Sequence, residues 1–257
     1  MTSGDIVNQA VLHQAFYHSA HRISIYLSMP TSELSTTHIV HQALRDGKEV
    51  FVPYLHKSSE SDRGPDGYLP ARCMDMVKLR DWQDFEGLEV DRWNIPTVPD
   101  EGIEGRESIL GGRGGVGRGK GEVEGLDLML LPGVAFQIGK EGEVRRLGHG
   151  KGFYDFFLRR LRTGIEAKND RSEGWPKLVG LALEEQLIAE TEDELPMGEN
   201  DQRLDSVVIG VGRILGAKET SWAQKYPKYS KEEVEAYIEQ EKAEKKRKVA
   251  EKAKQQS

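Results

Sequence analysis

The feature that most constrains the fold is a strand-like segment that leads through a glycine-rich turn into an apolar helix. The strand is the run 126–131 (LDLMLL), which stops at Pro132 and Gly133. Short apolar runs of this kind suit strands that are buried on both faces of a parallel sheet. The turn is 146–152 (RLGHGKG), and apolar residues follow it within 153–161. This order is typical of α/β folds, in which ligands bind outside the carboxyl ends of the strands.

The glycine-rich turn has the composition of a phosphate-binding loop. Gly148, Gly150 and Gly152 would let backbone N–H groups approach an anion closely, and Lys151 would add a point charge. The positive end of the following helix would face the same place. An ordinary surface turn before a helix could have the same glycines. The strand before the turn and the carboxylate of Asp155 after it favour the phosphate site.

The rest of the sequence alternates between strand and helix patterns. We expect strands at 22–28, 48–53, 75–79, 126–131, 178–183 and 205–210, and helices at 5–19, from Thr36 or Thr37 through Leu44, at 152–162 and at 184–190. Alternation of this kind predicts a mostly parallel sheet covered by helices on both faces, in a three-layer α/β/α arrangement. A chain of 257 residues is long enough to bury one substantial core.

The sequence therefore predicts a single domain over residues 1–225, followed by a charged tail. Residues 56–72 and 99–125 are polar and broken by glycine and proline, and we predict that they are flexible insertions. Residues 226–257 carry Glu and Lys at helical spacing and are expected to form a solvated helix. The basic cluster 245–248 (KKRK) in that tail could instead be a nuclear import signal or a contact for polyanions.

Composition excludes several classes of protein. A net charge of −7 argues against a general nucleic-acid binder, and no segment is apolar enough to predict a membrane span. The single cysteine, Cys73, excludes an intrachain disulfide, and its sequence neighbours Arg72 and Met74 suggest no base, so a small buried residue is favoured over a nucleophile. The first ten residues lack the pattern of a secretory or mitochondrial leader, so we expect a cytoplasmic protein, and we expect a monomer.

A second glycine-rich stretch imitates a nucleotide-binding motif. Residues 114–120 spell G-x-x-x-x-G-K, but Gly121 stands where the motif needs Ser or Thr, and the stretch precedes a strand instead of opening a helix. We therefore do not assign the nucleotide to it. The same stretch is also not favoured as an RNA-binding segment, because no aromatic residues are interleaved with its glycines and arginines.

Three segments around the glycine-rich turn follow one another along the chain: LPGVAF, a short hairpin at 139–142, and RLGHGKGFYDFFL. This order resembles the signature of the 5-formyltetrahydrofolate cyclo-ligase family, whose usual form is close to PGxxF…RLGRGKGYYD. Other segments resemble the family in the same order along the chain. They are 22–29 (RISIYLSM), Glu33, 48–53 (KEVFVP), 74–77 (MDMV), 93–96 (WNIP), 181–186 (LALEEQ) and 199–201 (END). The likeness covers most of residues 5–210 and implies the same α/β/α architecture.

This resemblance implies a role for each matching residue. The ATP-binding residues would be Arg146, Leu147, Gly148, His149, Gly150, Lys151, Gly152, Phe153 and Tyr154, and the magnesium ligands would be Asp155 and Asp201. The folate would contact Tyr26, Leu27, Met29, Glu33, Met74, Trp93, Phe153 and Tyr154, several of which could equally be core residues. Lys151, Tyr154 and Glu33 would be the catalytic residues.

The implied reaction is the closure of 5-formyltetrahydrofolate to 5,10-methenyltetrahydrofolate, with ATP converted to ADP and phosphate through a phosphorylated formyl group. Two departures from the family stand out. His149 replaces the usual arginine of GRGKG, and no Lys or Arg precedes Arg22, whereas the family has a basic leading helix that reaches ATP. These departures predict weak ATP binding. They leave open an alternative, a silent relative that binds nucleotide or folate as a regulatory or interaction protein.

Overall fold

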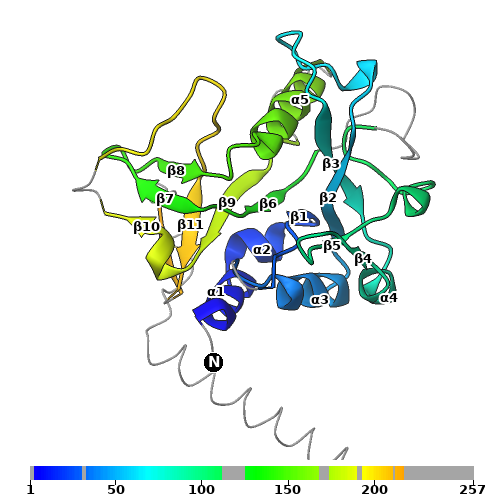
Figure 1. The fold of residues 1–257 in the computed structure, drawn as a ribbon. Coiled ribbons are helices and arrows are strands. Elements are labelled where there is room, and N and C mark those ends of the chain that lie inside the picture. The colour runs from blue at the N-terminus through cyan, green and yellow to red at the C-terminus, as the bar shows by residue number, and fades with distance from the viewer. Residues whose placement is uncertain are drawn as a thin grey trace, which may run out of the picture.

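The computed structural model describes residues 3–30, 33–111, 125–167, 174–189, 193–210 and 212–216. Its centre is a seven-stranded sheet with the order β12-β11-β9-β6-β1-β2-β3 (Figure 1). The strands are β1 (Arg22–Ile25), β2 (Glu49–Lys57), β3 (Arg72–Lys78), β6 (Leu128–Leu131), β9 (Lys177–Ala182), β11 (Ser206–Ile209) and β12 (Arg213–Leu215). The inner strands β2, β1, β6, β9 and β11 are parallel, and the edge strands β3 and β12 are antiparallel to their neighbours. The predicted mostly parallel sheet is confirmed.

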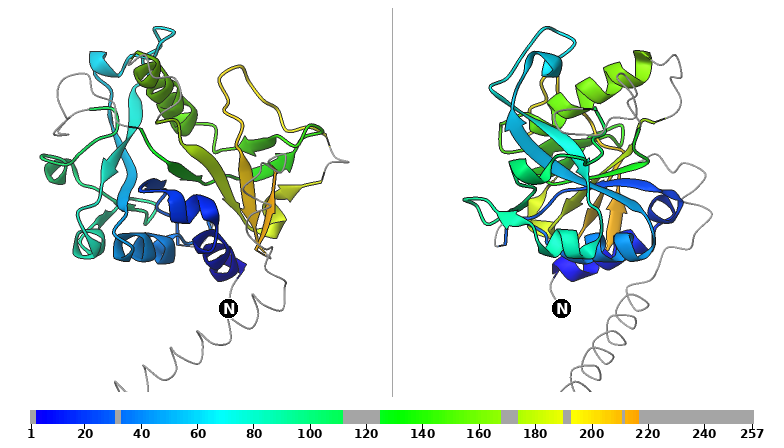
Figure 2. Two further views of the ribbon diagram at one scale, coloured as in Figure 1. Left: turned by 180° about the vertical axis from the view of Figure 1, so that it is seen from behind. Right: turned by 90° about the vertical axis from the view of Figure 1, so that its right-hand side faces the viewer.

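Helices cover the two faces of this sheet. Strand residues alternate between two cores, as in β2, where Val50 and Val52 join one core and Phe51 joins the other. The first core contains α1 (Ser3–Leu12), α2 (Ala15–Ser19) and α3 (Thr37–Arg45), and α4 (Trp82–Glu86) packs against it. The second contains the apolar face of α5 (Phe153–Ala167). Figure 2 shows α5 on the opposite side of the sheet from the first three helices, which is the predicted three-layer arrangement.

Short elements complete the fold. β7 (Ala135–Ile138), β8 (Val144–Leu147) and β10 (Leu187–Ile188) form a three-stranded sheet, and β4 (Glu89–Val90) pairs with β5 (Pro96–Thr97). The 3₁₀ turns are η1 (Glu60–Asp62), η2 (Asp100–Gly102) and η3 (Glu184–Gln186). None of the helices in the described ranges is long and apolar enough to cross a membrane.

Two predicted helices differ from the structure. The helix expected at 5–19 is divided at Gln14, whose extended backbone (φ −85°, ψ 145°) separates α1 from α2. The helix expected at 184–190 is wrong: η3 is a single turn, and Leu187 and Ile188 pair as a strand with Phe136 and Gln137 of β7. A short apolar segment does not by itself distinguish a helix from a strand, and here tertiary pairing decides.

The predicted insertions contain regular structure where they are described. Residues 56–72 include the end of β2, the η1 turn and the start of β3. Residues 99–111 include η2 and the buried side chains of Ile103, Arg106 and Ile109. The glycine-rich stretch 112–124 and the charged tail 226–257 lie outside the described residues.

The strand order determines where the predicted site residues lie. The chain runs from β1 to β2 on one side, and β6 later pairs with β1 on the other side, so the order reverses between β1 and β6. Crevices outside the carboxyl ends of strands at such a reversal are the usual ligand sites of open α/β sheets. Residues 26–30 leave β1 at this edge, and Pro132 leaves β6 there.

Candidate active site

The glycine-rich loop lies between β8 and the first turn of α5. Its backbone requires glycine, because Gly150 and Gly152 have φ values of +73° and +64°, which side chains rarely adopt. A Cβ atom at either position would meet no other atom within 4 Å, so the space above the loop is open. An anion could therefore approach the loop backbone and the first N–H groups of α5.

The loop presents its polar side chains to solvent. His149 and Lys151 are both exposed. Neither has a hydrogen-bond or ion-pair partner among the described residues, so the charge of Lys151 is free to meet a ligand. Leu147, at the end of β8, is also exposed.

Arg146 points from β8 toward the start of α5. Its Nη2 atom donates to Oδ2 of Asp155 at 2.9 Å, and its Nη1 donates to the carbonyl of Pro132 at 3.3 Å. The Arg146 guanidinium also lies 5.6 Å from the ring centroid of Tyr154. The structure thus brings together the end of β6, the end of β8 and the first turn of α5.

Asp155 also connects to the loop that carries Asp201. The backbone N–H of Gln202 donates to Oδ1 of Asp155 at 3.0 Å. The Asp201 side chain is exposed and accepts from the backbone N–H of Gly198 at 2.7 Å, which closes a tight turn. The two carboxylates proposed for magnesium therefore lie on segments joined by a hydrogen bond. Sequence reasoning missed Gln202, because a backbone donor has no side-chain signal.

Two tyrosines and one glutamate surround the folate side of the predicted site. Burial and the negative charge of Glu33 raise the pKa of Tyr26 well above its ordinary value, and the same two causes raise the pKa of Tyr154. Glu33 accepts from the backbone N–H of Met29 at 2.9 Å, and the Tyr26 hydroxyl donates to the carbonyl of Leu34 at 2.9 Å. Tyr26, Glu33 and Tyr154 thus share one electrostatic environment, and both tyrosine hydroxyls stay protonated.

The other residues predicted to contact folate are spread more widely. Leu27 is buried, and Met29 and Phe153 are partly buried. Met74 is 2% exposed, and its side chain packs in the core beneath α5. Trp93 is 60% exposed on the turn between β4 and β5, where it contacts Arg92.

The sequence pattern of the 5-formyltetrahydrofolate cyclo-ligase family matches residues 2–210 of this chain. A mouse 5-formyltetrahydrofolate cyclo-ligase is 32% identical over 203 residues, which are 79% of this chain and 80% of the relative. A Caenorhabditis elegans protein described as a probable 5-formyltetrahydrofolate cyclo-ligase is 31% identical over 204 residues, again 79% and 80% of the two chains.

The fold agrees with a solved structure. The NMR structure of an Aquifex aeolicus 5,10-methenyltetrahydrofolate synthetase superposes with a TM-score of 0.53 at 19% identity, covering 88% of this chain and 85% of the other. A more distant relative from Arabidopsis thaliana, 26% identical over 82% of this chain and 66% of its own length, is a mitochondrial 5-formyltetrahydrofolate cyclo-ligase.

Proposed function

Because the chain belongs to the 5-formyltetrahydrofolate cyclo-ligase family, we propose that it closes 5-formyltetrahydrofolate to 5,10-methenyltetrahydrofolate with conversion of ATP to ADP and phosphate. One observation carries this proposal in the structure. An open glycine loop lies beside Arg146 and the first turn of α5, at the reversal of strand order, and its Lys151 has no polar partner in the described part of the chain. That arrangement combines an anion site with the place where α/β sheets bind ligands.

On the nucleotide side, the loop backbone and two cations would hold the triphosphate. The loop 147–152 and the N–H groups of Phe153 and Tyr154 would cradle phosphate oxygens, and Lys151 and Arg146 would neutralise their charge. His149, where the family has arginine, would add charge only when protonated. A Cβ atom at Gly150 or Gly152 would meet no other atom within 4 Å, so a phosphate oxygen could approach the loop backbone there.

Magnesium would be held by Asp155 and Asp201. Mg²⁺ prefers one or two carboxylates together with phosphate oxygens and water, and these two acids lie on segments joined by the Gln202 hydrogen bond. When bound, the ion would neutralise charge on the phosphate oxygens. Its arrival would require Asp155 to exchange at least part of its contact with Arg146.

On the folate side, Glu33 and the hydroxyl of Tyr154 would orient the pterin and the formyl group, beside Tyr26, Leu27, Met29 and Phe153. The formyl oxygen takes the γ-phosphoryl group, which makes it a leaving group. N10 then attacks the formyl carbon and loses its proton, and the oxygen departs as phosphate. Positioning and charge neutralisation are the main demands of such chemistry.

The direct test mixes the full chain with ATP, Mg²⁺ and 5-formyltetrahydrofolate and follows the absorbance band of methenyltetrahydrofolate. Growth of the band that depends on both ATP and enzyme supports the proposal. Binding of ATP or folate without any growth of the band favours a silent relative, for which the absence of Lys and Arg before Arg22 is the motivating observation.

We also propose a monomer in the cytoplasm. A fluorescent fusion and sedimentation of the purified chain test these two points. Import of the fusion into mitochondria, as the name of the Arabidopsis relative would suggest, or a dimer at micromolar concentration would contradict them.

A further inference from the structure

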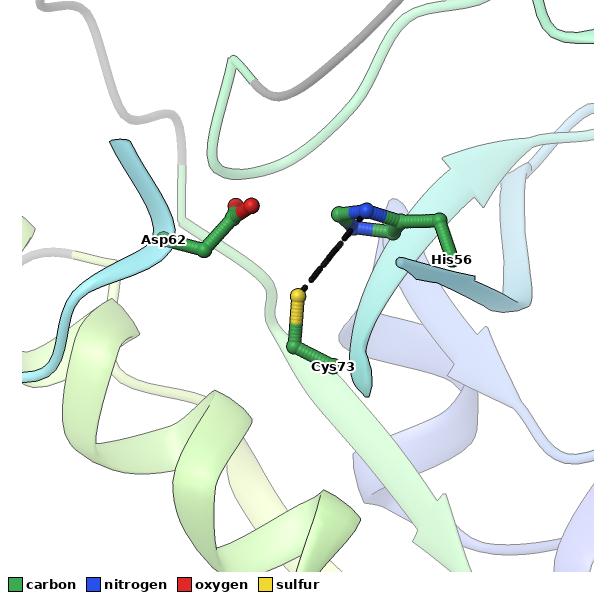
Figure 3. Close-up of side chains that lie close together, drawn as sticks. All are labelled: His56, Asp62 and Cys73. Carbon is green, nitrogen blue, oxygen red and sulfur yellow. Dashed lines mark hydrogen bonds between the residues drawn. The ribbon is translucent and has the colours of Figure 1, made fainter. Parts of the chain in front are cut away.

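Away from the proposed active site, a second cluster of reactive side chains is buried between the β2–β3 hairpin and α5. His56 on β2 lies directly opposite Cys73 on β3, and Asp62 reaches the same place from the η1 turn (Figure 3). The three residues are 4%, 0% and 4% exposed. From the sequence alone, Cys73 seemed to have no base beside it; the base comes from the opposite strand.

The donor atoms of these residues are close enough for a common ligand. One donor atom from each residue lies within 4.8 Å of the other two. The Sγ atom of Cys73 is 3.4 Å from Nε2 of His56. Tetrahedral zinc with bonds of about 2.0–2.3 Å separates its ligand atoms by roughly 3.3–3.8 Å, so one pair is already at this spacing and the others must approach by up to about 1.5 Å.

We propose that His56, Asp62 and Cys73 form a binding site for a divalent transition metal ion of the Zn²⁺ class. The donor set is an imidazole nitrogen, a carboxylate oxygen and a thiolate sulfur, which are the ligand types that Zn²⁺ takes in proteins. Asp75 lies beside this set, where its Oδ2 atom is 3.1 Å from Nε2 of His56.

The surroundings of His56 resemble those of a metal-binding histidine. Its Nδ1 atom lies 3.1 Å from the carbonyl of Lys57, so Nδ1 can donate to that carbonyl while Nε2 faces the cluster. A second hydrogen bond of this kind fixes the ring orientation of most histidine ligands. The Tyr54 ring stacks on the imidazole with the ring centroids 5.3 Å apart, and this contact also restrains the orientation of the imidazole.

Arg160 of α5 places a positive charge beside the proposed cation site, where it binds both carboxylates. Its Nη1 donates to Oδ1 of Asp62 at 3.1 Å and its Nη2 donates to Oδ1 of Asp75 at 2.6 Å. The guanidinium thus orients both carboxylates. The second oxygen of Asp62, Oδ2, accepts from the backbone N–H and the hydroxyl of Ser59 at 2.8 Å each, and Oδ2 of Asp75 lies 3.1 Å from Nε2 of His56, so a bound ion would exchange part of these contacts. Outer contacts of this type normally support metal ligands.

The formal charges balance with and without the ion. In the metal-free cluster, Arg160 and a protonated His56 balance Asp62 and Asp75, and the hydrogen bond to Asp75 raises the pKa of His56 to about 10. With the ion bound, Zn²⁺ and Arg160 balance Asp62, Asp75 and the Cys73 thiolate. Binding therefore exchanges one divalent ion for two protons, as metal binding to histidine and thiol ligands generally releases protons.

Cobalt titration tests the site, because Co²⁺ bound to a thiolate has a near-ultraviolet charge-transfer band. Cys73 is the only cysteine of the chain, so any such band reports this residue. The full chain, stripped of metal with a chelator and kept reduced, should develop the band up to one equivalent of Co²⁺, and Zn²⁺ should abolish it. Absence of the band when Cys73 is shown to be reduced overturns the proposal.

Matched variants separate this site from the proposed magnesium site. Cys73→Ser should remove the band and weaken Zn²⁺ binding at least about 100-fold, and Asp62→Asn should weaken it about 10-fold or more. His18→Gln, at an exposed histidine of α2, and Lys151→Ala should bind Zn²⁺ like the wild type. Unchanged Zn²⁺ affinity in Cys73→Ser would overturn the site, whatever the cyclo-ligase assay gives. Should that variant fail to fold, the wild-type cobalt spectrum decides.

Discussion

Arg146 and Asp155, a proposed phosphate ligand and a proposed magnesium ligand, form an ion pair with each other at 2.9 Å. Their side chains are 6% and 14% exposed, so the pair is largely shielded from water. Without ligands, each neutralises the charge that the other would offer to ATP and to Mg²⁺. This pair is therefore electrically satisfied without ligands, and a ligand that binds either side chain would compete with the ion pair.

Asp155→Asn and Asp201→Asn test the magnesium assignment. Asparagine keeps an oxygen that can accept from Gln202 or from Gly198, so both turns should persist while one negative charge is lost. Turnover should fall, and the Mg²⁺ concentration for half-maximal activity should rise in both variants. Magnesium titrations of the closure reaction measure this, and an unchanged magnesium requirement in either variant removes that residue from the metal site.

Lys151→Ala should lower turnover by about 10²-fold or more, because it removes a preorganised charge that stabilises the transferring phosphoryl group. Folding should be unaffected, since Lys151 is exposed and has no polar partner in the described part of the chain. Lys120→Ala and deletion of 111–121 are the controls and should leave turnover nearly unchanged. Closure assays on the three variants decide which loop holds the nucleotide. If only the deletion of 111–121 abolished activity, the nucleotide would be assigned to that loop and not to the loop with Lys151.

His149→Arg tests the departure from the family motif. Arginine carries a permanent charge and a planar fork of donors that matches phosphate oxygens, which an imidazole ring lacks. His149→Arg should therefore bind ATP more tightly than the wild type, by about 10-fold or more. Calorimetric titrations with ATP measure this affinity. Equal affinities in both proteins would mean that His149 does not face the phosphates.

Alkaline conditions should destabilise the protein through its buried tyrosines. Burial raises the pKa of Tyr17, Tyr26 and Tyr154 above the ordinary value, so folding favours their protonated forms. This contribution to stability is present in full below the unfolded-state pKa of about 10 and is lost as pH rises above it, because the unfolded tyrosines ionise first. Spectrophotometric titration should show fewer ionised tyrosines at pH 11 in the native protein than in guanidinium. Equal numbers would contradict the prediction.

Arg106→Ala should destabilise the protein by about 3–5 kcal/mol, as removal of one partner from a buried ion pair does. Arg106 is 4% exposed, pairs with Asp84 at 2.6 Å and also donates to the carbonyls of Lys78 and Gly102. Arg63→Ala, in an exposed pair with Glu60, is the matched control and should cost about 1 kcal/mol or less. Denaturant unfolding measures the free energy of unfolding of both variants. Similar decreases in the two variants would contradict the prediction that burial makes the Arg106 pair more important.

The sequence by itself determined the local elements of the proposed site and the class of the fold. The strand 126–131, the turn 146–152 and the helix that follows could be read directly, because apolar spacing and glycine placement are local signals. Alternation of strands and helices predicted the parallel sheet and its covered faces. The same local reading failed at 184–190, where pairing with β7 turned a helix-like segment into a strand.

Only the tertiary structure decided which groups meet across the chain. Asp155 receives its second hydrogen bond from the Gln202 backbone, and His56 meets Cys73 through the antiparallel register of β2 and β3. Met74, a predicted folate contact, is buried in the core by strand alternation and the packing of α5. Contacts of this kind depend on register and on long-range packing, which the local pattern of a single sequence does not fix.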